Sequence, residues 1–373
     1  MFVLLNHNNY KMNCIVCNKI SYKISHNLFF RHFDFKLINF SVHFYKCTNC
    51  QLIFNPSYLK IFNLSKINSK SYIKSKQTEH KLYCKKEKLF ATRSYFQVNL
   101  FYKKRILNNK IKKILDFGCF DGLFLKEVKK NFKNIDLFGY DNNIYLKKIF
   151  KFDKNKLILK KKELFNHKFD LIFFSFSIFY VYNLNHLFNI ILKNILNNNG
   201  KIVVHIPDIE RNNGYFLYGD QRFIPTKVNL INIFNFYGYK YRVIKSSIFN
   251  KDYIFVFTKT ENSKLVFLKE NKTVKIIHNL KKLTLKLRSI SSDRLLVFGT
   301  TINAAFYDQI LKNRNVSFVD ENIDYPKREF RRKLIIHPKN LNTNSIIIVP
   351  RFKGSNILIK RLRNTYEGNF YLI

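Results

Sequence analysis

The sequence predicts an α/β protein built around a mostly parallel sheet, with a short cysteine-bearing module before the sheet and a smaller α/β unit after it. Three observations support this fold class. Four cysteines form two C-x-x-C pairs near the start of the chain. Apolar strand-like runs then alternate with stretches of helical periodicity, which is the pattern of a parallel sheet covered by helices. Near residue 264 a strand, glycine turn and helix pattern starts again.

The cysteine module occupies residues 1–60. Cys14 and Cys17 lie in "MNCIVCNK", and Cys47 and Cys50 lie in "KCTNCQLIFNP". A two-residue spacer lets one tight turn aim both sulfurs at a metal, and four thiolates form a closed structural zinc site. Polar/apolar alternation between the pairs suits short antiparallel strands, so we predict a zinc-binding ribbon. The alternatives are two disulfides or four unrelated thiols, although disulfides are uncommon in a cytosolic chain.

The next part of the chain, residues 61–110, is a predicted helical lead-in. Its stretch 79–110 contains no Gly or Pro and spaces its apolar side chains as one or two helices would. A central domain at residues 111–263 follows, with strands predicted around Ile114 and Leu115 and in "DLFGYD", "FDLIFFSF", "GKIVVHIP" and "DYIFVFTK". The last domain, residues 264–373, has its own strands in "LLVFG", "VSFVDEN" and "SIIIVPRF".

The composition indicates in which compartment the protein acts and what kind of molecule it binds. "MFVLL" is too short for the apolar region of a signal peptide, and "LIFFSFSIFYVY" is too short to span a bilayer, so we expect a cytoplasmic protein without a membrane span. The net charge of +43 is spread along the chain, among many residues with A/T-rich codons. A biased gene composition accounts for it without a nucleic-acid partner. Because a basic surface attracts anions, we expect an anionic or nucleotide-linked small-molecule substrate. The oligomeric state is not indicated.

The most informative stretch is "LDFGCFDG", in which Asp116, Gly118 and Gly122 form D-x-G-x-x-x-G between a predicted strand and a predicted helix. Glycines let a backbone turn tightly and approach a ligand, and open α/β sheets bind ligands at this edge. The next predicted strand ends at Asp141, where an acidic side chain can accept hydrogen bonds from both ribose hydroxyls. The alternative is a generic turn whose glycines are only structural.

The spacing also indicates which ligand would bind. A wide glycine gap and a leading acid suit a ligand without a pyrophosphate, and S-adenosylmethionine is one, with a zwitterionic amino-acid end and a positive sulfonium. Asp116 would favour the ammonium group, directly or through water. Asp141 would hold the ribose, and Glu163, after the third strand, is a candidate to face the adenine.

With these motifs the chain resembles a zinc-ribbon-led, class I S-adenosylmethionine-dependent methyltransferase. The layout of ribbon, Rossmann-like methyltransferase sheet and small Rossmann-like C-terminal domain is similar to that of the deoxysugar C-methyltransferase family. "CTNCQLIFNP" resembles that family's second cysteine knuckle and the tail after it. The resemblance implies a structural Zn²⁺ and methyl transfer to a nucleotide-linked sugar or another small polar molecule, at carbon, oxygen or nitrogen.

The chain departs from this family at the acid/base positions. Residues 178–180 read Ile-Phe-Tyr where relatives read Leu-Glu-His, and Gly219-Asp220 stands where the family carries Glu-His. Asp220, His205 and Tyr180 are the candidate catalytic residues, near the predicted ends of strands four and five. For each, the alternative is an ordinary loop or core residue.

Two other functions remain open. An RNA or protein methyltransferase would use the ribbon and the basic surface for docking, and its RNA binding would weaken steeply with salt. A catalytically inactive zinc-ribbon binding protein would keep the fold without binding S-adenosylmethionine.

Overall fold

The computed structural model describes residues 11–24, 28–29, 41–56, 81–84, 87–210, 221–260, 265–291, 294–311, 315–322, 329–331, 333–351 and 354–373. The chain divides into two compact units. One unit comprises residues 1–22, 45–208 and 221–269, and the other comprises 23–44, 209–220 and 270–373. In the described part of the chain, no helix combines the length and apolarity needed to cross a bilayer.

The cysteine module folds as a small four-stranded sheet in the order β1-β2-β5-β6, formed by β1 (Lys11–Asn13), β2 (Ile20–Lys23), β5 (Tyr45–Cys47) and β6 (Ile53–Phe54). One cysteine pair lies in the turn after β1, and the other lies at the end of β5. This placement is what two knuckles of a ribbon require. In the sequence between the two cysteine pairs, two further short strands, β3 (Leu28–Phe29) and β4 (Ser41–Val42), pair antiparallel with each other. The intervening residues 30–40 lie outside the described part.

The prediction of helices over residues 79–110 is wrong for its first part. β7 (Lys81–Cys84) and β8 (Leu89–Thr92) form an antiparallel hairpin, and only then does α2 (Arg93–Lys103) begin. The aromatic rings of Tyr83 and Phe90 face each other across the hairpin, with centroids 4.6 Å apart. Such cross-strand aromatic pairs stabilise a hairpin, which outweighs the helix propensity of the segment. The predicted lead-in residues 61–80 lie outside the described part.

The central sheet has seven strands in the order β11-β10-β9-β12-β13-β15-β14. Their bounds are β9 (Lys113–Phe117), β10 (Asp136–Tyr140), β11 (Leu157–Ile158), β12 (Phe169–Ser175), β13 (Leu196–Pro207), β14 (Tyr239–Ile244) and β15 (Asp252–Lys259). The first five neighbours are parallel in the Rossmann order 3-2-1-4-5, while β15 runs antiparallel to both β13 and β14. This topology confirms the predicted Rossmann-like sheet, in which the structure also locates the short β11 and β14.

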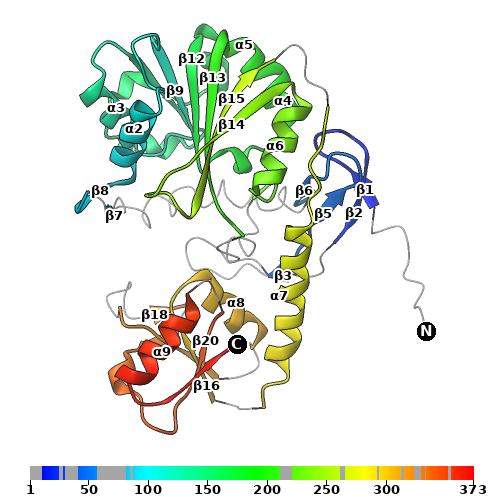
Figure 1. Ribbon diagram of the computed structural model, residues 1–373, viewed down its shortest axis with the longest axis vertical. Coiled ribbons are helices and arrows are strands. Elements are labelled where there is room, and N and C mark those ends of the chain that lie inside the picture. The colour runs from blue at the N-terminus through cyan, green and yellow to red at the C-terminus, as the bar shows by residue number, and fades with distance from the viewer. Residues whose placement is uncertain are drawn as a thin grey trace. The chain divides into compact units, whose positions relative to one another are not determined.

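Helices cover both faces of this sheet (Figure 1). On one face, α2 and α3 (Leu123–Asn131) pack on alternate strand residues such as Ile114 and Phe173. On the other face, two helical segments pack on Leu115 and Phe174. One is α6 (Lys227–Phe236), and the other is a continuous stretch made of α4 (Leu184–His186), the π-helix η6 (Leu187–Leu192) and α5 (Lys193–Ile195). The connections carry the short 3-10 helices η2 (Ile144–Lys148), η3 (Lys154–Lys156), η4 (Lys161–Asn166) and η5 (Ile178–Tyr180).

The second unit contains the predicted smaller α/β fold. Its sheet has the order β18-β19-β17-β16-β20-β21, formed by β16 (Arg294–Phe298), β17 (Asn315–Val319), β18 (Glu329–Phe330), β19 (Lys333–Ile336), β20 (Ile346–Val349) and β21 (Asn369–Leu372). In the part of this sheet that runs from β19 to β21, each strand is parallel to the strand beside it, and the strand order is again 3-2-1-4-5. The unit also holds α7 (Lys272–Arg288), α8 (Ile302–Ile310), η9 (Pro338–Asn340) and α9 (Ser355–Thr365).

Candidate functional site

The turn between β9 and α3 is shaped by two glycines in the left-handed region, Gly118 with φ of 84° and Gly122 with φ of 74°. The Gly118 N–H donates to the Tyr140 carbonyl at 2.7 Å, which ties the turn to β10. A Cβ at Gly118 would lie 2.5 Å from the Ser177 Cβ, and one at Gly122 would lie 2.5 Å from the Phe150 ring. Packing within the chain therefore demands both glycines, so the case for a ligand rests on the acids beside them.

Asp116, at the end of β9, is the most unusual of these acids. Its side chain is buried, with 3% of the residue exposed, and its Oδ1 atom has no hydrogen-bond partner among the described residues. Burial raises the pKa of this carboxyl to about 8, and the nearby charges of Asp141 and Asp121 act in the same direction. A buried, unpaired carboxylate is costly, so the site suits a cationic group that would pair with it.

Asp141 follows the last residue of β10, the strand beside β9. Its Oδ1 accepts from the Asn143 N–H at 3.0 Å. Burial raises the pKa of this carboxyl, and hydrogen bonds from neighbouring backbone N–H groups oppose the rise. Glu163 is half-buried in η4, the helix that follows β11, and its own N–H donates to the Lys160 carbonyl. The three acids thus lie at or after the carboxyl ends of three adjacent strands, β9, β10 and β11, at one edge of the sheet.

A buried chain of hydrogen bonds lies at the same edge and was not predicted from the sequence. The Gln97 amide, on α2, donates to Ser175 Oγ at 3.0 Å and contacts His205 Nδ1 at 2.8 Å. His205 Nε2 lies 3.0 Å from Asp252 Oδ2, which also accepts from Arg93 at 2.8 Å. No local spacing could have indicated these contacts, since they join residues far apart in sequence.

The structure places the three candidate catalytic residues very differently. His205 is fully buried, and both of its ring nitrogens have partners. Burial lowers the pKa of His205 despite the opposing effect of Asp252, so the imidazole is neutral near pH 7. Tyr180 is half-buried in η5, where its N–H donates to the Ser177 carbonyl. Asp220 lies outside the described residues.

The four predicted zinc ligands come together in the ribbon. The Sγ atoms of Cys14, Cys17, Cys47 and Cys50 all lie within 4.8 Å of one another, with the Cys14–Cys50 pair at 3.5 Å and the Cys17–Cys47 pair at 3.4 Å. A tetrahedral zinc site with Zn–S bonds of about 2.3 Å has S–S edges of about 3.8 Å. The donor set and its dimensions therefore fit a zinc ion.

Two asparagines of α6 fix the second knuckle against the central domain. Asn229 is fully buried, accepts from the Ile53 N–H at 3.2 Å and donates to the carbonyls of Ile53 and Ile224. Asn232 donates to the Cys50 carbonyl at 2.9 Å. This docking could not be predicted from the sequence, because an asparagine on an apolar helix only interrupts the hydrophobic pattern.

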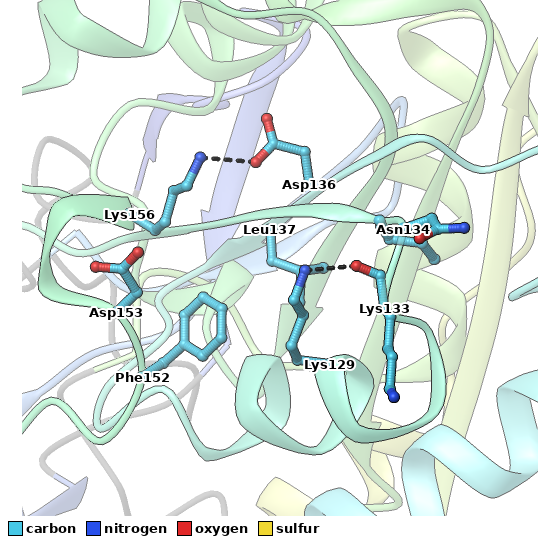
Figure 2. Close-up of a pocket in the computed structure, with 9 residues that line it drawn as sticks. Lys129, Lys133, Asn134, Asp136, Leu137, Phe152, Asp153 and Lys156 are labelled. Atoms are coloured by element: carbon cyan, nitrogen blue, oxygen red, sulfur yellow. Dashed lines mark hydrogen bonds and ion pairs between the residues drawn. The ribbon is translucent and has the colours of Figure 1, made fainter.

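A cavity of about 300 Å³ lies at the other end of β10 (Figure 2). Asp136, the first residue of that strand, lines it together with Lys129, Lys133 and Lys156. Two of these lysines already have partners: Lys156 pairs with Asp136 at 2.8 Å, and Lys129 donates to the Lys133 carbonyl at 2.6 Å. Asp141 follows the opposite end of the strand, so this cavity is separate from the predicted cofactor site.

Comparison with known proteins supports the methyltransferase interpretation. Residues 91–240 match a family described as "Methyltransferase domain", which bears out the prediction of a methyltransferase-class enzyme. The matched region begins within β8 and ends within β14, so it includes the glycine turn, Asp141 and most of the buried hydrogen-bond chain, but not Asp252. No curated protein matches the chain.

Solved structures of methyltransferases are also similar, at low identity. A putative O-methyltransferase from Nostoc punctiforme is 16% identical over 44% of this chain and 55% of its own, with a TM-score of 0.36, so the chain spans about half the length of that protein. A SAM-dependent methyltransferase from Archaeoglobus fulgidus is 14% identical over 45% of this chain and 95% of its own, with a TM-score of 0.36. The plantazolicin methyltransferase BpumL, in complex with SAH, is 14% identical over 55% of this chain and 93% of its own, with a TM-score of 0.38.

Proposed function

We propose that the chain transfers a methyl group from S-adenosylmethionine, bound at the turn between β9 and α3, to a small polar acceptor. The observation that carries this proposal is Asp116, a buried carboxylate whose Oδ1 has no partner among the described residues, at the ligand-binding edge of a Rossmann-order sheet. The cofactor's ammonium group is the kind of partner that would offset the cost of burying that charge.

The neighbouring acids complete the proposed cofactor site. Asp141 would accept hydrogen bonds from the ribose hydroxyls, since it follows the strand next to β9. Glu163 would face the adenine from the next strand along. Gly118 and Gly122 would keep the backbone of the turn close to the ligand. S-adenosylmethionine supplies an electrophilic methyl group on a sulfonium, and the role of the chain is to align acceptor and donor in a nearly dry site.

The acceptor is proposed to be a nucleotide-linked sugar or a related polar metabolite. The three-part layout supports this class, and the net charge of +43 favours an anionic molecule. If carbon is methylated, Asp220 and Tyr180 are the proposed proton acceptors. His205 would serve indirectly, because it is fully buried and holds Asp252 rather than facing a ligand.

The ribbon is proposed to bind one structural Zn²⁺ through Cys14, Cys17, Cys47 and Cys50. Their thiols must be reduced to bind the metal, so the proposal includes a reducing compartment such as the cytoplasm. The proposed domains are the ribbon at 1–60, the lead-in at 61–110, the methyltransferase domain at 111–263 and the Rossmann-like domain at 264–373.

Calorimetric titration with S-adenosylhomocysteine tests the cofactor site. Asp141→Ala removes a charge-assisted acceptor, so we expect an affinity loss of roughly ten- to a hundredfold. Asp136→Ala is the matched control, because it removes a carboxylate from the opposite end of the same strand. The proposal fails if the wild-type chain does not bind, or if both variants bind as the wild type does.

A further inference from the structure

Arg93, the first residue of α2, is a cation held in a fixed plane at the edge of the central sheet. Its guanidinium carbon lies 4.8 Å from the ring centroid of Phe176 and 5.6 Å from that of Phe249. Its Nη1 donates to Asp252 Oδ2 at 2.8 Å, and the side chain is 35% exposed. Within the described ranges this is its one hydrogen bond, so the edge formed by Nε and Nη2 is left for another acceptor.

The partner of Arg93 is itself immobilised. Asp252 Oδ2 lies between Arg93 Nη1 and His205 Nε2, and Gln97 supplies an amide N–H to the other nitrogen of His205. The hydrogen bonds therefore assign the proton of His205 to Nε2. Burial acts to raise the pKa of Asp252, but the hydrogen bonds from His205 and Arg93 and the charge of Arg93 outweigh it and hold that pKa below its usual range. The carboxylate stays ionised and the guanidinium stays oriented.

The sheet register places Asp116, Ser175 and His205 at the same edge of the sheet as Asp252, the partner of Arg93. Phe173 on β12 pairs with Asp116 on β9, and Ser175 pairs with His205 on β13. Strand alternation points Asp116, Ser175 and His205 toward the face covered by α2 and α3. Phe176, which stacks on Arg93, precedes Ser177, whose Oγ donates to the Phe117 carbonyl at 2.5 Å beside the glycine turn.

We propose that Arg93 binds the carboxylate of the amino-acid end of S-adenosylmethionine, while Asp116 takes the ammonium group. The inference rests on the proposed function. Ammonium and carboxylate share one carbon in that ligand, so a site for this end needs an acid and a base at the same edge of the sheet. An arginine is suited to the task because its planar fork matches a carboxylate bidentately, and two flanking rings fix its plane.

A nearby lysine offers a contrast. Lys151 Nζ lies 3.2 Å from Asp121 Oδ2 at the glycine turn, and its side chain is 43% exposed. Its charge thus faces an acid of the chain, and it lacks the planar fork and the aromatic support of Arg93. Lys151→Ala therefore serves as the matched control, since it removes a positive charge from the same edge without removing the proposed carboxylate contact.

The test compares two ligands that differ in the amino-acid end. S-Adenosylhomocysteine and 5′-methylthioadenosine are titrated calorimetrically into the full chain, as wild type, Arg93→Ala, Arg93→Lys and Lys151→Ala. We expect Arg93→Ala to weaken S-adenosylhomocysteine roughly ten- to a hundredfold, while 5′-methylthioadenosine, which has no carboxylate, binds as before. Arg93→Lys, which keeps the charge and the pairing with Asp252, should lose less, and Lys151→Ala should bind both ligands as the wild type does.

Three results would overturn the inference. Equal losses for both ligands in Arg93→Ala and Arg93→Lys would show that Arg93 only supports the fold. Unchanged affinity for S-adenosylhomocysteine in Arg93→Ala, or a selective loss in Lys151→Ala instead, would place the carboxylate elsewhere while leaving the proposed function intact. A wild-type chain that binds neither ligand would overturn the proposed function as well.

Discussion

Replacing Asp116 with asparagine should stabilise the ligand-free protein while weakening its binding of S-adenosylhomocysteine. Asparagine has nearly the same shape as aspartate but carries no charge. In the folded chain this carboxyl is buried with its Oδ1 unpartnered among the described residues, and Asp141 and Asp121 add negative charge nearby. Asparagine would be buried in the same place with the same lack of a partner but without the charge, so the stabilisation expected for Asp116→Asn at pH 8 is the extra cost of burying a charged group, on the order of a few kcal/mol.

The stabilisation by Asp116→Asn should depend on pH in a defined direction. The pKa of Asp116 is raised from 3.8 to about 8 on folding, mainly by burial. Between these values the folded chain keeps a proton that the unfolded chain has released, so the stability due to this group falls as the pH rises from about 4 to about 8 and changes no further above pH 8. The advantage of Asp116→Asn should therefore be small near pH 4 and full above pH 8.

Thermal unfolding of the ligand-free variants between pH 5 and pH 8.5 measures the effect. For a domain of this size, each kcal/mol shifts the unfolding temperature by roughly 2–4 °C. Asp121→Asn is the control on the same turn, because its carboxylate already accepts from the Leu123 N–H and pairs with Lys151. It should be no more stable than the wild type. An Asp116→Asn variant that gains nothing at pH 8, or gains equally at pH 5, would refute the reasoning.

Two further predictions concern the ribbon. Cys47→Ser should reduce the zinc content, measured by elemental analysis, from about one ion per chain to none. The control Cys84→Ser removes a buried thiol outside the cluster and should leave the zinc content unchanged. Full zinc content in the Cys47 variant would exclude the site. Asn229→Ala leaves the Ile53 N–H and the Ile224 carbonyl without their side-chain partner, so it should lower the free energy of unfolding by about 1–3 kcal/mol in chemical denaturation. Asn194→Ala, an exposed control, should have little effect, and equal losses in both variants would contradict the anchoring role.

The sequence predicted those features that local patterns encode. The strand, glycine turn and helix around Asp116 and Gly118 follow from hydrophobic periodicity and from glycine chemistry, and the structure has β9 and α3 there. The cysteine cluster was predictable because a C-x-x-C spacing and one tetrahedral ion restrict the geometry strongly. The β7–β8 hairpin was mistaken for helix, since its stabilisation comes from a cross-strand contact between Tyr83 and Phe90.

The contacts that sequence reasoning missed are the long-range ones. Arg93 and Asp252 come from α2 and β15, and Gln97 and His205 come from α2 and β13, so only the assembled sheet brings them together. Each of these residues fits an ordinary helix or strand pattern on its own. The same holds for Asn229, whose three hydrogen bonds to the knuckle and to residue 224 appear only when the ribbon docks on α6.

The most direct test of the central claim is a crystal structure of the chain with S-adenosylhomocysteine. The account predicts the ligand at the turn between β9 and α3, with the ribose hydroxyls about 3 Å from the Asp141 carboxylate and the amino group near Asp116. Density for the ligand at any other place in the chain, or a ribose that makes no contact with Asp141, would contradict the account.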